Sequence, residues 1–83
     1  MNDADIRVFE STKMTLGANN SMIPVVRVTV KDEENSFSYS FPILGGDVVR
    51  FPEKLSYPGS EYYDEIMSEL KRENWTPYRV RRN

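Results

Sequence analysis

The chain has 83 residues, a formal net charge of −2 at pH 7, and neither cysteine nor histidine. This length allows one domain, residues 1–83. The missing residue types exclude disulfides, zinc, haem and iron–sulfur ligation and histidine-assisted triads, so we expect no cofactor, no metal site and no catalytic residues. A chain this short also rarely encloses the deep cleft of a carboxylate-based enzyme, and we expect a protein that is not an enzyme.

The first segments in chain order are strands. Residues 6–16 alternate between apolar and polar side chains, with Phe9 falling on the polar face. Pro24 to Lys31 is the clearest strand, because valine alternates there with polar residues. Its window 25–30 is the most β-prone of the chain, so we expect a central strand paired on both sides. At an edge, the same window would pair with a second copy and form a homodimer.

A third strand is predicted at residues 36–41, where three aromatic residues alternate with serines. We expect the rings to face the core, because burying them is worth several kcal/mol to a small domain; the alternative is an exposed stacking platform. Gly45-Gly46 predicts a two-residue type I′ hairpin, since both central residues of that turn need positive φ. Pro42, which has no N–H, places its strand at an edge or at a bulge.

The next segment predicts one helix, from an N-cap at Ser60 to about Glu73. Its inner face combines side chains that lie three and four residues apart, namely Tyr63, Ile66, Met67 and Leu70. Asn74 suits the left-handed position that follows a helix, and this conformation would fold Trp75 back onto the helix.

Residues 76–82 predict a last strand, and Pro77 near its start argues for an edge position. The alternation sorts its side chains into an inward pair and an outward pair, Tyr78 with Val80 and Arg79 with Arg81. The element order is therefore β-β-β-β-α-β. We expect an α+β fold, a small antiparallel sheet of about five strands with one helix packed on its apolar face. An OB-like small barrel is the alternative.

Charge is distributed unevenly along the sequence. Residues 1–70 carry six basic and twelve acidic side chains, net −6, whereas residues 71–83 carry five basic and one acidic, net +4. The helix offers a carboxylate ridge to a basic partner through Glu61, Glu65, Glu69 and Glu73. The C-terminal end offers a surface that could grip phosphates and stack bases, made of Trp75, Tyr78, Arg79, Arg81 and Arg82. A solvated helix face and a solvated basic tail are the alternatives.

The composition, the charge distribution and the predicted fold suggest three functions, in decreasing order of expectation. We expect first a small acidic protein-binding module that occupies a surface of a macromolecular partner, and second a single-stranded nucleic-acid-binding protein that uses the basic C-terminal strand. The acidic net charge weakens the second, because long-range repulsion slows encounter. A self-assembling structural (virion) subunit comes third. In its size, its acidity and its lack of catalytic residues, the chain resembles the small accessory proteins that viruses of bacteria encode. This resemblance implies an inhibitor or accessory role.

Two further features concern location. The longest unbroken apolar stretch, residues 22–26, is too short to span a bilayer, so we expect no membrane contact. The first five residues are acidic and polar, the reverse of the basic start of a signal peptide. We therefore expect a cytoplasmic protein, and the lack of cysteine suits that reducing compartment.

Overall fold

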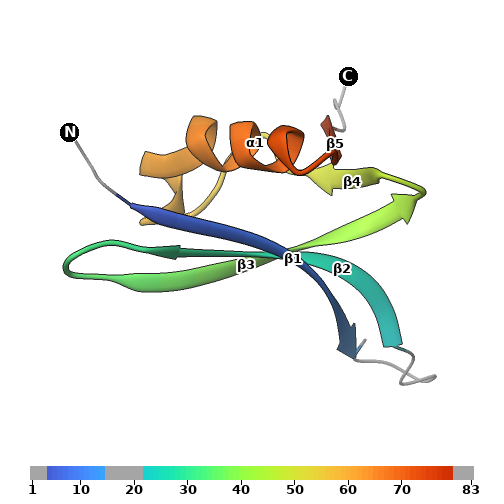
Figure 1. The fold of residues 1–83 in the computed structure, drawn as a ribbon, viewed down its shortest axis with the longest axis horizontal. Coiled ribbons are helices and arrows are strands. Elements are labelled where there is room, and N and C mark those ends of the chain that lie inside the picture. The colour runs from blue at the N-terminus through green and yellow to red at the C-terminus, as the bar shows by residue number, and fades with distance from the viewer. Residues whose placement is uncertain (1–3, 15–21, 80–83) are drawn as a thin grey trace.

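The computed structural model, which describes residues 4–14 and 22–79, has an α+β fold (Figure 1). Its strands are β1 Asp5–Met14, β2 Met22–Lys31, β3 Ser36–Gly45, β4 Val48–Phe51 and β5 Thr76–Arg79. The helix before β5 begins as a 3₁₀ turn, η1 Gly59–Tyr62, and continues as α1 Tyr63–Arg72. The strands lie in one open sheet in the order β1-β2-β3-β4-β5, which confirms the predicted class and element order. The alternative of a closed OB-like barrel is not formed.

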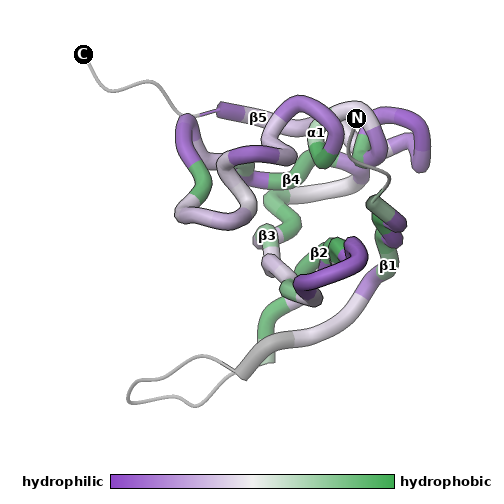
Figure 2. Tube along the Cα trace, turned by 90° about the vertical axis from the view of Figure 1, so that its left-hand side faces the viewer, coloured by the Kyte–Doolittle hydropathy of each residue, from purple (hydrophilic) through white to green (hydrophobic). Residues whose placement is uncertain are grey.

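The sheet curves around the helix. Seen along the strands, it passes from β1 through β2 and β3 and then rises to β4 and β5, while α1 lies across the open side (Figure 2). The helix accordingly contacts β1 and β5, the two edge strands. β2 is a central strand paired with β1 and β3, as its valine-rich sequence predicted.

The core lies between the concave side of the sheet and the helix. Ile66 and Leu70 of α1 are fully buried there with alternate residues of the strands, Val26, Val28, Val30, Phe41, Val49 and Phe51. Phe37 and Tyr39 are partly buried against the same cluster, so the aromatic side of β3 faces the core as predicted. Phe9 lies on the other face of the sheet and is 46% exposed.

β3 changes partner along its length. Its first part pairs with β2 as far as Val25 opposite Pro42, and its last part pairs with β4 at Ile43 opposite Val49 and Gly45 opposite Val48. A bulge lies between Ile43 and Gly45, so Pro42 sits beside an irregularity in a central strand and not at an edge.

The hairpin that joins β3 to β4 differs from its prediction by one residue. Gly45 is still part of β3, and the two turn residues are Gly46 and Asp47. Among the described glycines only Gly46 has a positive φ, 56°, so the predicted type I′ turn with two left-handed residues is wrong. The bulge in β3 shifts the pairing and moves the turn along the chain.

β5 lies at an edge, as Pro77 predicted, but it runs parallel to β4. The sheet is therefore mostly antiparallel, with one parallel pair at this end. The helix explains the difference, because it carries the chain back to the end where β4 begins, and a parallel pair needs such a crossover. Thr76 then docks on the hairpin, where its N–H donates to the Asp47 carbonyl at 2.8 Å and its hydroxyl contacts Asp47 Oδ2 at 2.7 Å.

Of the two predictions made for the ends of the helix, the N-cap is wrong and the left-handed residue after the C-terminus is confirmed. Ser60 is not its N-cap, because the chain already turns as η1 from Gly59 and no side chain caps either helical segment. At the other end Asn74 has the predicted positive φ, 71°. Its N–H donates to the Lys71 carbonyl at 3.0 Å, and the N–H of Trp75 donates to the Leu70 carbonyl at 2.8 Å. This pattern is a Schellman motif, and it packs Trp75 against the core.

The full burial of Leu70 leads to a first prediction. Leu70→Ala removes a fully buried side chain between helix and sheet, and should lower the free energy of unfolding by about 2–5 kcal/mol. Urea unfolding followed by circular dichroism measures this loss. Lys71→Ala, at the exposed neighbouring position, should change it by less than about 0.5 kcal/mol. Equal stability of the two variants would contradict the helix-on-sheet core.

Candidate partner-binding surface

The predicted carboxylate ridge is divided among three elements. Glu61 lies in η1, Glu65 and Glu69 lie in α1, and Glu73 is the residue that ends the helix. A regular spacing of four requires continuous α-helix, and α1 begins only at Tyr63. Glu69 also accepts a hydrogen bond from Arg72 Nη1 at 2.9 Å, which offsets its charge. The spacing of four therefore falls within regular α-helix and its C-cap for Glu65, Glu69 and Glu73, and the role of the ridge in binding stays a prediction.

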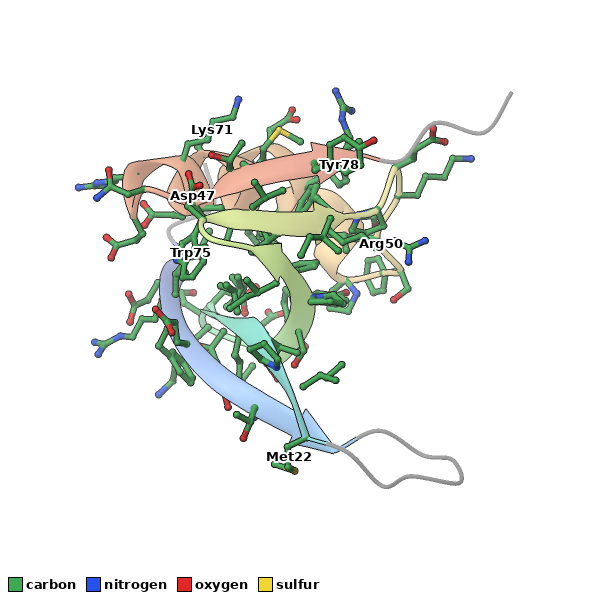
Figure 3. The ribbon with its side chains drawn as sticks, turned by 90° about the vertical axis from the view of Figure 1, so that its right-hand side faces the viewer. Met22, Asp47, Arg50, Lys71, Trp75 and Tyr78 are labelled. Atoms are coloured by element: carbon green, nitrogen blue, oxygen red, sulfur yellow. The ribbon has the colours of Figure 1, made fainter. Side chains whose placement is uncertain are left out.

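The predicted basic and aromatic surface is also divided. Trp75 is half-buried against the core, and Lys71 lies at the opposite end of β5 from Tyr78 (Figure 3). Arg81 and Arg82 lie outside the described residues, as does Val80. Two of the candidate side chains, Tyr78 and Arg79, are exposed neighbours in β5.

Tyr78 and Arg79 point to opposite faces of the sheet, and their assignment is the reverse of the predicted one. Tyr78 is aligned with Arg50 of β4, and Arg79 is aligned with Phe51, which is buried in the core. Aligned residues of neighbouring strands point to the same side. Tyr78 is therefore on the outer face, 53% exposed, and the prediction that it points inward is wrong. Four residues of edge strand carry too weak an alternation to fix the face.

Arg50 is the functional candidate that sequence reasoning missed. It is exposed on the outer face beside Tyr78, and both are labelled at the same end of β4 and β5 in Figure 3. Ion pairs among the described residues occur at Arg7 and Arg72, and none occurs at Arg50. One signal in the sequence indicated that Arg50 would face outward: it lies between two apolar residues of a β-prone run, Val49 and Phe51. Both of these are buried in the structure.

A groove of about 430 Å³ adjoins Arg50. It is lined by residues 39–42 of β3, by Arg50 and Phe51 of β4, and by Pro52 and Leu55 of the following loop. The groove exists because β4 ends at Phe51, so that β3 has paired residues on its β4 side only at Ile43 and Gly45. Aromatic and proline side chains give it an apolar lining with one cation at its margin.

Two tyrosine hydroxyls fix the loop that forms the far wall of the groove. Tyr39 Oη donates to the Ser56 carbonyl at 2.6 Å and accepts from the N–H of Gly59 at 3.0 Å. Tyr63 Oη donates to the Pro52 carbonyl at 2.6 Å. Gly59 is required at its position, because a Cβ there would overlap the Tyr39 ring. The loop is therefore held in one place before any partner arrives.

A third tyrosine joins the helical segment to the turn between β2 and β3. Tyr62 Oη donates to Asp32 Oδ2 at 2.7 Å, while Asp32 Oδ1 accepts from the N–H groups of Asn35 at 2.6 Å and Glu34 at 2.9 Å. These three donors, Tyr62 first, hold the pKa of Asp32 below its usual range. The same hydrogen bond, with burial, raises the pKa of Tyr62 to about 12.

A metal ion requires clustered ligand side chains, and a membrane span requires a long apolar helix. Within residues 4–14 and 22–79, no three acidic side chains come together in a way that could hold a metal ion. The helix of this part is neither long nor apolar enough to cross a bilayer. Comparison with known proteins finds no family model that matches the chain, and no curated protein or solved structure that matches it.

Tyr39→Phe should loosen the loop beside the groove. The variant leaves the buried N–H of Gly59 without its acceptor, which costs about 1–3 kcal/mol of unfolding free energy. Hydrogen exchange at the Gly59 amide should become faster, and urea unfolding should show the loss. Tyr57→Phe is the matched control, since Tyr57 is 74% exposed, and it should leave both measurements unchanged. Unaltered exchange at Gly59 in Tyr39→Phe would refute this account.

The shifted pKa of Tyr62 predicts a loss of stability at alkaline pH. The unfolded phenol ionises near pH 10, and the folded one holds its proton to about pH 12. The contribution of Tyr62 is therefore complete below pH 10 and lost as the pH rises from 10 to 12. Urea unfolding of wild type and Tyr62→Phe over that range should show the stability difference narrowing. A difference that stays constant would contradict the Tyr62–Asp32 hydrogen bond.

Proposed function

We propose that this protein is a binding module that occupies a surface of a protein partner, and that the partner contacts the outer face at Arg50 and Tyr78 and the adjoining groove. The observation that carries the proposal is the position of an unpaired arginine, aligned with an exposed tyrosine, at the margin of an apolar groove. Such a module acts by covering a surface and needs no catalytic group, which is how a small inhibitor or accessory protein works.

The chemistry of this surface defines what it can recognise. Tyrosine and arginine are enriched at protein interfaces, where each supplies a large contact area together with polar groups. The guanidinium of Arg50 suits a carboxylate, and the groove beside it suits an apolar side chain. Leu44 of β3, which is not among the residues that line the groove, is a further exposed apolar side chain, at 53%. The expected target is an acidic segment with an apolar residue next to its carboxylate.

The distribution of cations within residues 4–14 and 22–79 favours a protein over nucleic acid. A strand of nucleic acid is held by several cations along one track. Here Arg50 and Arg79 lie on opposite faces of the sheet, and Lys71 lies at the far end of β5 (Figure 3). Arg72 is paired with Glu69. Arg50 is the one cation among the described residues that line the groove, and with Tyr78 beside it this supports recognition of a side chain more than of a phosphate backbone.

Selection from a displayed library of random peptides tests the proposal. Peptides retained by wild type should be enriched in Asp or Glu next to an apolar residue. Fluorescence anisotropy should then show that Arg50→Glu weakens their binding by at least about tenfold, because central interface arginines commonly contribute more than about 1.4 kcal/mol. Tyr78→Ala should weaken it as well. Both variants should keep the wild-type melting curve, since both side chains are exposed.

Arg79→Glu is the matched control, because it reverses an exposed cation one position along β5 on the opposite face. It should leave peptide binding unchanged. Salt-sensitive binding of wild type to oligothymidylate that is weakened by Arg79→Glu and Arg50→Glu alike would favour the nucleic-acid function instead. Equal loss of peptide binding in both variants would contradict a site centred on Arg50.

A further inference from the structure

The two edges of the sheet differ in their ability to accept another strand. In β5, the N–H of Thr76 points to the side of β4, where it donates to the carbonyl of Asp47 in the turn before that strand. Backbone groups of a strand point alternately to its two sides, so the free side begins at Pro77, which has no N–H. A four-residue edge with a proline at this position is poorly suited to pair with a further strand.

β1 offers a much longer edge. It pairs with β2 over all of Asp5–Met14, and no other segment among the described residues pairs with its outer side. The sequence of β1 contains no proline, so each residue whose backbone points to the outer side offers both an N–H and a C=O. Figure 2 shows β1 at the end of the curved sheet that lies away from β4 and β5. Phe9 in its middle is 46% exposed on the outer face.

The helix leaves room beside this edge. An open groove of about 330 Å³ separates Ala4 and Ile6, at the start of β1, from Asp64, Glu65, Ser68 and Glu69 of α1. A strand that approached the outer side of β1 would meet this open groove, because α1 contacts β1 without filling the space beside Ala4 and Ile6.

We propose that β1 pairs antiparallel with β1 of a second copy of this chain, with a two-fold axis at Phe9. To keep the two core faces on the same side, facing positions must both be odd or both be even. Among such registers, the one centred on Phe9 sets Asp5 opposite the partner's Lys13 and Arg7 opposite the partner's Ser11. An acidic position of β1 is then opposite a basic position at both ends, and Phe9, which is exposed, is opposite its own copy at the axis.

The neighbouring registers lack this complementarity. Centring the pair on Val8 sets Asp5 opposite the partner's Ser11 and Arg7 opposite the partner's Phe9, so no opposite charges are paired within β1. Centring it on Glu10 sets Glu10 against itself and Arg7 opposite the partner's Lys13, and centring it on Arg7 sets Arg7 against itself. Like charges placed directly opposite each other oppose pairing. The charge pattern of β1 therefore selects the Phe9 register and identifies a second copy as the occupant of this edge.

A single cysteine at the axis tests the register, because the chain has no other cysteine. In the Phe9→Cys variant the two Cα atoms would lie about 4.5–5.5 Å apart, within the range that a disulfide spans. Mild oxidation should convert most of it to a covalent dimer. Tyr57→Cys, at a position 74% exposed and far from β1 in the sheet order, should stay largely monomeric. Cross-linking of Phe9→Cys no faster than of Tyr57→Cys would overturn the proposal.

Charge reversal tests the pairing without covalent chemistry. Sedimentation equilibrium of wild type should show a reversible monomer–dimer equilibrium. Asp5→Lys should weaken dimerisation about threefold or more, because the proposed register would then place two basic residues at opposite positions, 5 and 13, at both ends of the pair. Adding Lys13→Asp should restore it. This rescue separates the intermolecular pair from the Asp5–Arg7 contact of 3.1 Å within one chain, which the double variant does not restore.

Three results would overturn the proposal: a wild type that stays monomeric at every concentration, a dimer that Asp5→Lys does not weaken, or a weakening that Lys13→Asp does not rescue. Arg50→Glu, on the outer face of β4, should leave the equilibrium unchanged, so failure of this proposal and failure of the binding proposal are distinguishable.

Discussion

The groove and the outer face both depend on the way β3 divides its length between two neighbours. It pairs with β2 as far as Pro42 and with β4 from Ile43 onward, and the change occurs at a residue that cannot donate a ladder hydrogen bond. β4 is short and ends before Pro52, so the first half of β3 has no strand on that side. The following loop fills the space only in part, because the Tyr39 hydroxyl ties it back at Ser56 and Gly59. The groove is the space that remains.

Local patterns predicted the elements well, and long-range pairing decided the details that they missed. The alternation of β2 and of residues 36–41 is dictated by burial on one face, and the structure confirms both. The left-handed Asn74 follows from local chemistry and is confirmed as well. The parallel direction of β5 and the turn at Gly46 depend instead on the crossover helix and on a bulge in β3. A sequence pattern with a period of two carries neither piece of information.

The candidate surface was predicted only in part, because charged residues that are close in the sequence need not lie on the same face of the folded protein. Glutamates at a spacing of four were expected to form one ridge, but a 3₁₀ turn precedes the α-helix and an arginine pairs with Glu69. Tyr78 was predicted on the inner face and lies on the outer one, since a four-residue edge strand gives a one-residue ambiguity. Arg50 went unnoticed because its partner Tyr78 lies far along the chain. Only the β4–β5 register brings them together.

The two proposed surfaces lie at opposite ends of the strand order, and this separation has a functional consequence. A dimer formed through β1 leaves β4, β5 and the groove of each copy uncovered. The two-fold axis then presents two equivalent grooves at the outer ends of the paired sheets. A partner that displays its acidic segment more than once, as an oligomer does, would engage both, and the second contact would form within the same complex. Linked binding of this kind can raise avidity by about 10²–10⁴ over one site, so a single groove of modest affinity is sufficient for a dimeric module.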